Sequence, residues 1–376
     1  MRIGIDGRFL GAEGTGIGRY TEKLLENLEV LDNKNDYFVF LRKANFPLYN
    51  PGSSNFHKVL TDVRWYTLKE QVVMPASLFA RKLDLVHFPQ INIPLLYPGR
   101  FVVTLHDLTK INFKDQAAAP HTPLVYQAKH LAFTFILKQA LKRAQMIFTP
   151  SEFVKSGLSQ TMKIDKSKII TTYEGADDFA LKFSPGEGSV KEALDRYSVK
   201  APYILYLGNA YPHKNLERLM EALLKIDPQV TLVCIIKRDV FSQRITSKAE
   251  NLGIRNRVVF IPGVSDEYLK IFFSQAECLV FPSLSEGFGL PGLEAMAVGC
   301  PVVAANATSL PEVYQEAAVY FDPYNVADIA SKVTSVIKSE KMKIDLCKKG
   351  REQVKKYSWK KMAEDTLKVY NTLLSQ

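Results

Sequence analysis

The chain contains little cysteine. Its 376 residues include four cysteines, which lie far apart and form no Cys-x-x-Cys pair. Three of the four lie in or beside apolar runs, as small buried thiols do, and none has a nearby histidine partner. This pattern argues against a disulfide framework and a zinc site, and it indicates a reducing compartment. The four residues are Cys234, Cys278, Cys300 and Cys347.

Long apolar runs are also absent. No stretch approaches the roughly 20 apolar residues that span a bilayer. The opening segment, MRIGIDGRFL, has an acidic residue and two glycines where a signal peptide needs an apolar region. We therefore expect a soluble, cytoplasmic protein. The sequence has no Asp-x-Asp pair and no His/Cys/Asp cluster with metal-ligand spacing, so we expect no metal. It also lacks a P-loop lysine motif and a Gly-x-Ser-x-Gly elbow.

The charge is unevenly distributed along the chain. The net charge is +10 and the pI is about 9.2, and residues 1–185 carry about +7 of that charge. Such a balance suits nucleic acid, an anionic membrane surface or phosphate-bearing substrates, or it is simply a basic surface. The lysines are scattered rather than gathered on one helix or interleaved with aromatics, so we expect no nucleic-acid binding.

Short β-branched or aromatic runs alternate with amphipathic segments. The runs are almost continuously apolar, which is typical of strands that are covered on both faces of a sheet. The alternation predicts an α/β protein with two doubly wound units. The expected strands are 2–6, 37–41, 83–87, 101–106, 145–149, 168–173, 203–208, 230–237, 257–261, 278–282, 301–304 and 318–321.

One expected helix has a single apolar face, with Asn215 before it as the expected N-cap. The residues on that face are Leu216, Leu219, Met220, Leu223 and Leu224. Proline and glycine cluster without periodicity at Lys182–Gly188, which predicts a linker. In open α/β sheets, ligands bind beyond the carboxyl ends of the strands, so we expect functional residues where strands end.

A glycine-rich turn lies between two carboxylates in SLSEGFGLPGLEAMAVGCPVVAA, residues 283–305. We expect a helix from about Pro291, so the turn and the helix N-terminus can seat a phosphate. Glu286 and Glu294 repel phosphate and are suited to hydroxyl groups, as an acidic residue is to a ribose diol. Together these features indicate a nucleotide sugar. The alternative is an ordinary strand-to-helix turn with solvated glutamates.

A second glycine loop, Gly14–Arg19, follows the first strand. It offers backbone amides and the Arg19 side chain to an anion, although it is not the dinucleotide fingerprint. Lys214 lies at a strand-to-helix junction, where it could offset the charge of a leaving diphosphate. The alternatives are a flexible turn and a solvated surface lysine.

Two histidines are placed where expected strands end. His106 stands beside Asp107 at the end of one strand, which favours a functional role, and His87 ends another and is the weaker candidate. The alternative is a histidine whose hydrogen bonds are satisfied in the core.

These motifs resemble a known family. The Glu286-x7-Glu294 pattern is similar to the signature of retaining GT-B glycosyltransferases of family four, and the opening segment most resembles their mannosyltransferase branch. The other similar segments, which span nearly the whole chain, are TGIGRYTEKLLENL, VVTLHDL, IFTPSEFVKSGL, PHKNL, SLPEVYQEAAVYFDP and YSWKKMAEDTLKVY.

The resemblance implies a GT-B fold, which is two doubly wound Rossmann-like domains facing across a cleft. It implies an acceptor-side domain over residues 1–183 and a nucleotide-sugar-binding domain over residues 184–356. Residues 357–376 would form a final helix that returns to the first domain.

The resemblance also implies roles for individual residues. His106 would position the transferred sugar, Glu286 would bind its hydroxyls and Lys214 would clamp the diphosphate, which makes these three the implied catalytic residues. The implied donor-binding residues are Gly16, Lys214, Val264, Glu286, Gly287, Phe288, Gly289, Leu290 and Glu294. The implied acceptor-side residues are Gly14, Arg19 and Asp107.

The chain departs from the family at one place. Many relatives have an arginine either five residues before the lysine or directly before it, where this chain has Asn209 and His213. A second cation for the phosphates would then come from Arg19 or Lys237.

The implied reaction transfers a hexose with retention, expected to be mannose from GDP-mannose, to a saccharide or lipid-linked saccharide in cell-envelope or O-antigen polysaccharide synthesis. No carboxylate suits the role of nucleophile, so we expect front-face attack, with no cofactor and no metal. The alternatives are UDP-glucose or another UDP-sugar as donor, and a degenerate nucleotide-sugar-binding module without catalysis.

Lipid-linked acceptors suggest peripheral contact with the inner face of a membrane. Residues 130–145 combine phenylalanine and leucine with Lys138, Lys142 and Arg143, as an interfacial helix does. The alternative is a core-facing stripe made of Phe133, Ile136, Leu137, Ala140, Leu141 and Ala144.

Overall fold

The computed structural model of the chain describes residues 1–11, 15–112, 123–176, 183, 185–236 and 240–375. The chain divides into two compact units. The first comprises Met1–Leu108, Ala119–Glu174 and Ser358–Gln376, and the second comprises Thr109–Ala118 and Gly175–Tyr357. Of the expected linker, residues 182 and 184 lie outside the described part of the chain.

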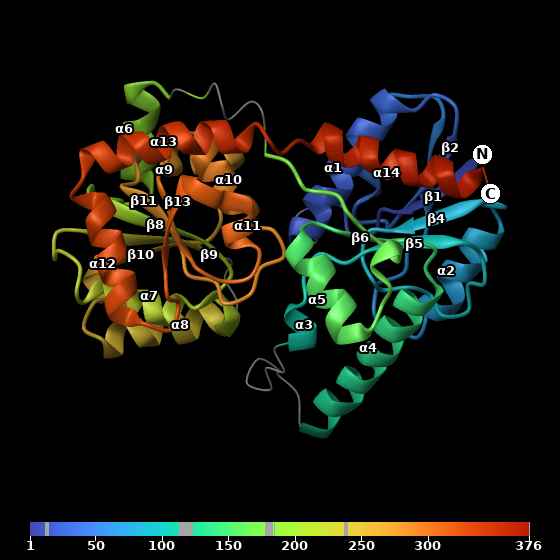
Figure 1. Cartoon of the computed structure of the whole chain (residues 1–376), viewed down its shortest axis with the longest axis horizontal. Coiled ribbons are helices and arrows are strands. Elements are labelled where there is room, and N and C mark those ends of the chain that lie inside the picture. Colours follow the sequence, from blue (N-terminus) through green and yellow to red (C-terminus); the bar gives the residue numbers. More distant parts are fainter. Residues whose placement is uncertain (12–14, 113–122, 177–182, 184, 237–239, 376) are drawn as a thin grey trace. The chain divides into compact units, whose positions relative to one another are not determined.

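One parallel sheet forms the centre of the first unit (Figure 1). Its strand order is β3-β2-β1-β4-β5-β6-β7, so the order reverses between β1 and β4, as in doubly wound folds. The inner strands bury almost every side chain, whereas the edge strands β3 and β7 are partly exposed. The strands are β1 (Arg2–Asp6), β2 (Asp36–Leu41), β3 (Phe56–Leu60), β4 (Leu85–Phe88), β5 (Phe101–Thr104), β6 (Ile147–Thr149) and β7 (Ile169–Thr171).

Helices from both ends of the chain belong to the first unit. The last helix packs along the first one, which brings the carboxyl-terminal residues into this unit (Figure 1). The helices are α1 (Thr15–Leu31), α2 (Glu70–Phe79), α4 (Pro123–Arg143), α5 (Glu152–Met162) and α14 (Trp359–Leu374). The short α3 (Thr109–Asn112) is grouped with the second unit.

A second parallel sheet, in the order β10-β9-β8-β11-β12-β13, forms the second unit. Its strands are β8 (Tyr203–Gly208), β9 (Thr231–Ile236), β10 (Val258–Ile261), β11 (Cys278–Phe281), β12 (Val302–Ala305) and β13 (Ala318–Phe321). Its other helices are α6 (Glu187–Arg196), α7 (Leu216–Leu223), α8 (Val240–Asn251), α9 (Asp266–Gln275), α10 (Leu290–Ala297), α11 (Leu310–Tyr314), α12 (Val326–Ile337) and α13 (Glu340–Val354). Two doubly wound α/β units are therefore confirmed.

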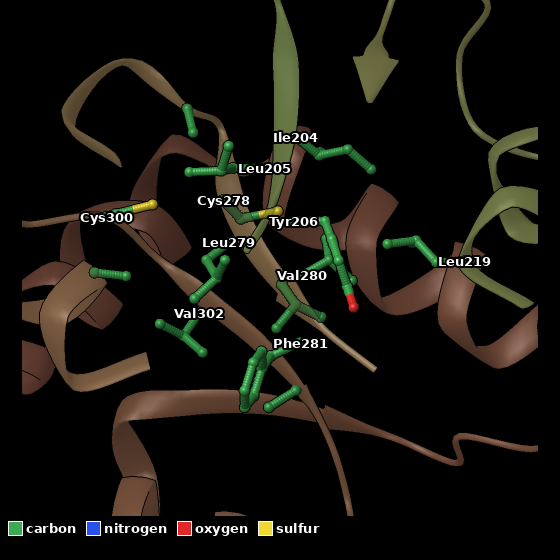
Figure 2. Close-up of a cluster of buried hydrophobic side chains, with 14 of the residues drawn as sticks. Ile204, Leu205, Tyr206, Leu219, Cys278, Leu279, Val280, Phe281, Cys300 and Val302 are labelled. Atoms are coloured by element: carbon green, nitrogen blue, oxygen red, sulfur yellow. The ribbon is translucent and has the colours of Figure 1, made fainter. Parts of the chain in front are cut away.

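The core of the second unit surrounds β8, β11 and β12 (Figure 2). Consecutive residues such as Ile204 and Leu205 are both fully buried, so both faces of the sheet are covered. The thiols of Cys278 and Cys300 lie in this core, and burial raises the pKa of each. Cys234 is buried as well, which confirms that these cysteines are packing residues, while Cys347 is half-buried.

Most strand limits agree with the sequence-based expectation to within about two residues. The strand β3 was not expected, because its sequence FHKVL has two consecutive polar residues and therefore no continuous apolar run, as suits a partly exposed edge strand. The expected apolar face of α7 is buried except at Leu224, which is 52% exposed because the helix ends at Leu223.

A buried histidine joins the last helix to the sheet of the first unit. The Nδ1 atom of His87 lies 2.5 Å from the Tyr370 hydroxyl of α14, and its Nε2 atom lies 2.8 Å from the Thr104 hydroxyl of β5. The side chain has no exposed surface, and burial lowers the pKa of His87 to about 3, with repulsion from His106 adding to the effect. His87 is therefore a core histidine, which was the alternative considered for it.

This burial predicts a loss of stability in acid. The unfolded histidine takes up a proton near pH 6.5, while the folded one resists protonation down to about pH 3, so protonation favours the unfolded state between these values. We expect the free energy of unfolding to fall by up to about 1.4 kcal/mol per pH unit below pH 6.5. Urea denaturation followed by tryptophan fluorescence measures it, because Trp65 and Trp359 both belong to the first unit.

His87→Gln should remove this part of the pH dependence, while His57→Gln, at a largely exposed histidine, is the matched control. Equal pH slopes for the wild type and His87→Gln would contradict the prediction.

Candidate functional site

The glycine turn between Glu286 and Glu294 leads from β11 into α10. Gly289 has φ of +100° and caps α10, a left-handed conformation that favours glycine. The Phe288 side chain is buried in the hydrophobic core, edge-on to Tyr357 at 5.4 Å, so the turn presents the backbone of Phe288. The helix begins one residue before the expected Pro291, and its N-terminus carries the positive end of the helix dipole.

Two predicted site residues meet at this turn. The Lys214 Nζ atom lies 2.6 Å from a carboxylate oxygen of Glu286, and their side chains are only 17% and 13% exposed. They meet because β8 and β11 are parallel neighbours whose carboxyl ends reach the same edge of the sheet. A cation and a hydroxyl-binding carboxylate are thus placed side by side, next to a helix N-terminus.

Asn215, the expected N-cap of α7, does not cap that helix with its side chain. It has a left-handed backbone with φ of +59°, and its Nδ2 atom donates to the carbonyl oxygens of Pro282 at 3.1 Å and Pro323 at 2.8 Å. Asn215 takes the expected N-cap position, but its side chain makes no capping bond because it is directed to these two carbonyl oxygens. Asn215 instead fixes the turn that carries Lys214.

Two hydroxyl residues after β12 hold the backbone of Glu286, and the sequence analysis did not identify them. The Glu286 amide donates to the Thr308 hydroxyl at 3.2 Å, and the Ser309 hydroxyl donates to the Glu286 carbonyl oxygen at 3.2 Å. Thr308 adopts a positive φ of 54°, which is unusual for a β-branched residue. No local motif predicts this contact, because it joins segments about twenty residues apart in the sequence.

Glu294 and Leu290 both belong to α10. Glu294 is half-buried within the helix, and its charge is one of the causes that raise the pKa of Tyr314. Leu290 is half-buried as the first residue of the helix, whereas Gly287 is buried. The E-x7-E spacing therefore places one carboxylate before the helix and the other on it.

In the first unit, His106 follows β5 and both of its ring nitrogens face acceptors. Nδ1 lies 3.2 Å from a Glu174 carboxylate oxygen, and Nε2 lies 2.9 Å from the Pro89 carbonyl oxygen. The Tyr20 ring packs edge-on at 4.8 Å. These two contacts, one at each nitrogen, hold the plane of the ring. Sequence reasoning missed Glu174, because it is 68 residues away in the chain.

The segment Gly14–Arg19 is mostly helical rather than a loop. Gly14 lies outside the described residues, and α1 begins at Thr15, so Gly16 and Arg19 belong to the first turns of a helix. A Cβ atom at Gly16 would meet no atom within 4 Å. At Gly18 it would lie 2.6 Å from the Gly11 carbonyl oxygen, so Gly18 is the glycine that a close approach requires.

Two further predicted residues, Val264 and Asp107, lie in different units. Val264 is half-buried between β10 and α9, after Gly263 with φ of +75°, and packs on the core of the second unit. Asp107 is exposed after β5 in the first unit.

Asn209 and His213, the positions where the resemblance led us to expect an arginine, make local hydrogen bonds. The Asn209 side-chain oxygen accepts from the Tyr211 amide at 3.3 Å, and the His213 carbonyl oxygen accepts from the Leu284 amide at 2.7 Å. Lys237, one suggested substitute, lies outside the described residues.

Within the described part of the chain, no group of three or more His, Cys, Asp or Glu residues could hold a metal ion. No helix among those residues is long and apolar enough to cross a membrane.

Comparison with known proteins gives a consistent result. Residues 195–356 match the family model described as "Glycosyl transferases group 1". The chain is 27% identical to the O-antigen chain mannosyltransferase RfbU of Salmonella typhimurium, in an alignment that covers 94% of this chain and 95% of the relative.

Solved structures share the fold. Sucrose-phosphate synthase from Thermosynechococcus elongatus matches with a TM-score of 0.80 at 21% identity, over 100% of this chain and 99% of that one. HepE of Anabaena in complex with UDP-glucose matches with a TM-score of 0.76 at 16% identity, over 99% and 100%. At these identities the structures establish the GT-B fold.

The contrast between two glycines of α1 can be tested. We expect Gly18→Ala to lower the free energy of unfolding by about 1–3 kcal/mol, because its methyl group would meet two backbone oxygens. Gly16→Ala is the matched control and should leave the free energy unchanged or raise it by up to about 1 kcal/mol, since alanine favours helix. Urea denaturation measures both, and equal stability of the two variants would show that α1 can shift away from Gly11.

Proposed function

We propose that this chain, which has the GT-B fold and matches the glycosyl transferases group 1 model over residues 195–356, is a glycosyltransferase. In this proposal it transfers mannose from GDP-mannose to a saccharide acceptor with retention. The observation that carries the proposal is the contact of Lys214 with Glu286 at the glycine turn before α10. The printed name of the Salmonella relative, a mannosyltransferase aligned over nearly the whole chain, supports mannose. A saccharide or lipid-linked saccharide of O-antigen or cell-envelope synthesis is the proposed acceptor.

In this proposal the second unit binds the donor. Lys214 and the first amides of α10 stabilise the diphosphate in the bound donor, and they stabilise the negative charge that develops on it as it leaves. Glu286 accepts hydrogen bonds from the sugar and Glu294 accepts them from the ribose diol, with Glu286 fixed through its backbone by Thr308 and Ser309. A positioned lysine and helix dipole supply the charge that a metal ion would supply, so we propose a reaction that needs no metal.

His106 of the first unit would position the sugar. Glu174 and Pro89 fix the plane of its ring, so the imidazole can be presented without a change of rotamer. No carboxylate is assigned as nucleophile, because both glutamates of the motif are assigned to hydroxyl groups. The leaving phosphate oxygen would then accept the proton of the attacking hydroxyl on the same face of the sugar.

The donor is identified by calorimetry and thermal shift with a panel of nucleotide sugars. We expect GDP-mannose to bind and stabilise the protein, with the same affinity in EDTA, and UDP-sugars to bind much more weakly. Glu294→Ala should lower donor affinity roughly tenfold or more through the lost charged hydrogen bonds. His106→Ala should slow transfer and leave donor affinity unchanged.

Stabilisation by UDP-glucose instead would favour the alternative donor, which the fold shared with the HepE complex keeps open. No binding of any nucleotide sugar would favour a degenerate binding module. Loss of binding in EDTA would contradict the metal-independent part of the proposal.

We also propose peripheral contact with an anionic membrane, through a face other than the one the sequence suggested. Residues 130–145 bury Leu137, Ala140 and Leu141, as the core-facing stripe predicts, and expose Leu131 and Phe135, so both faces of this segment are present. A second group of exposed apolar residues lies on α2 and in the segments next to it. These residues, called here the α2 face, are Leu68, Val72, Phe79 and Leu96, and each is more than half exposed.

Basic residues lie near the α2 face in the sequence. Val72 and Phe79 share one side of α2, and the Phe79 ring lies 5.7 Å from that of Tyr97, the residue after Leu96. The exposed basic residues around this face are Arg64, Lys69, Arg81 and Lys82. Exposed apolar side chains with a basic rim are complementary to anionic headgroups over an apolar interior.

Vesicle flotation tests this contact. We expect the protein to bind vesicles containing phosphatidylglycerol more strongly than phosphatidylcholine vesicles, and salt to weaken the binding. Val72→Ser with Phe79→Ser should reduce it about tenfold or more, since two buried apolar side chains are lost. Leu224→Ser, at an exposed leucine of the second unit, is the control, and equal binding by both variants would contradict the proposal.

A further inference from the structure

A tyrosine lies directly behind the glycine turn. Tyr314, the last residue of α11, has no exposed surface, and its hydroxyl donates to the Gly289 carbonyl oxygen at 2.5 Å. The carbonyl belongs to the residue that caps α10. The turn that presents its backbone to a ligand on one side is therefore bonded to a fixed side chain on the other.

The two glycines that follow Phe288 are shaped around this tyrosine. A Cβ atom at Gly289 would lie 2.4 Å from the Tyr314 hydroxyl oxygen, and one at Gly292 would lie 2.3 Å from both that oxygen and the Cζ atom. Real Cβ atoms do not approach other atoms so closely. Gly292 therefore leaves room for the ring, while Gly289 also needs its positive φ.

The hydroxyl of Tyr314 stays protonated, and so remains a donor. Burial raises the pKa of Tyr314 well above its usual value, and the negative charges of Glu286 and Glu294 raise it further.

We propose that Tyr314 is a positioning residue for the donor, which holds the turn Glu286–Gly292 in its binding conformation through the Gly289 carbonyl. Thr308 and Ser309 hold the amide and carbonyl of Glu286 at the start of the same turn. The segment from Thr308 to Tyr314 thus fixes the turn at both ends. This inference depends on the proposed function in one respect, that the turn binds a nucleotide sugar.

The physical consequence concerns the entropy of binding. A glycine-rich turn has many accessible conformations, and a ligand that orders it loses part of its binding free energy. A turn that is already ordered avoids this loss. Removing the hydroxyl of Tyr314 should therefore weaken donor binding more than it changes the rate of the bound complex.

A matched control is present in the same unit. Tyr203 is also fully buried, and its hydroxyl donates to the Phe272 backbone carbonyl oxygen at 2.8 Å. Tyr203→Phe and Tyr314→Phe each remove one buried hydrogen bond to a carbonyl without changing the ring. They should lower thermal stability by similar amounts.

The experiment compares the two variants by donor kinetics and by hydrogen–deuterium exchange. For Tyr314→Phe we expect KM for the nucleotide sugar that binds the wild type to rise about tenfold, with a smaller change in kcat. Exchange of the amides in residues 286–292 should become about tenfold faster. Tyr203→Phe should show neither effect. If Tyr314→Phe has the KM and exchange rates of Tyr203→Phe, the proposal is wrong.

A second variant provides a test if Tyr314→Phe does not fold. Ser309→Ala removes the hydroxyl that donates to the Glu286 carbonyl oxygen, and it should accelerate exchange over the same residues and raise the same KM. Unchanged exchange in Ser309→Ala would overturn the proposal where Tyr314→Phe does not fold.

The exchange measurement is independent of the donor. If no nucleotide sugar binds the wild type, the proposed function fails. The exchange rates of Tyr314→Phe and Tyr203→Phe then decide by themselves whether Tyr314 orders the turn.

Discussion

The ion pair of Lys214 with Glu286 is the interaction on which the candidate donor site depends. Two parallel strands, β8 and β11, end at one edge of the sheet and deliver opposite charges to it. Each charge is mostly shielded from water, so each would be costly without the other. Because each charge offsets the desolvation cost of the other, the Glu286 carboxylate can lie beside a buried glycine turn and a helix N-terminus. The surrounding contacts, from Asn215 on one side and Thr308 on the other, all serve to fix these two residues.

Local sequence signals predicted the parts of this site that lie on one segment. Continuous apolar runs predicted the buried strands, and the glycines and proline between Glu286 and Glu294 predicted the turn and the start of the helix there. Lys214 was expected at a strand-to-helix junction with a role at the diphosphate, and its meeting with Glu286 follows from the neighbouring positions of β8 and β11 in the sheet. These inferences needed only periodicity, spacing and the topology of the fold.

Contacts between distant segments were not predictable in the same way. Glu174 meets His106 across 68 residues, and Tyr314 meets Gly289 across 25, with no pattern in either segment that names the other. Asparagine is a residue type that commonly caps helices, but the Asn215 side chain instead donates hydrogen bonds to the carbonyl oxygens of Pro282 and Pro323. Glycine shows the same limit, because only the fold shows that Gly18 and not Gly16 is enclosed.

The first unit is built from segments that precede and follow the second unit in the sequence, so the two units are not completed in the order in which they begin. A ribosome completes Gly175–Tyr357 before it makes α14, so the second unit has all its strands available while the first still lacks a helix. Until then, His87 has no tyrosine partner and α1 has no neighbour along the face that α14 covers. During synthesis, part of the core of the first unit therefore stays exposed until α14 is translated.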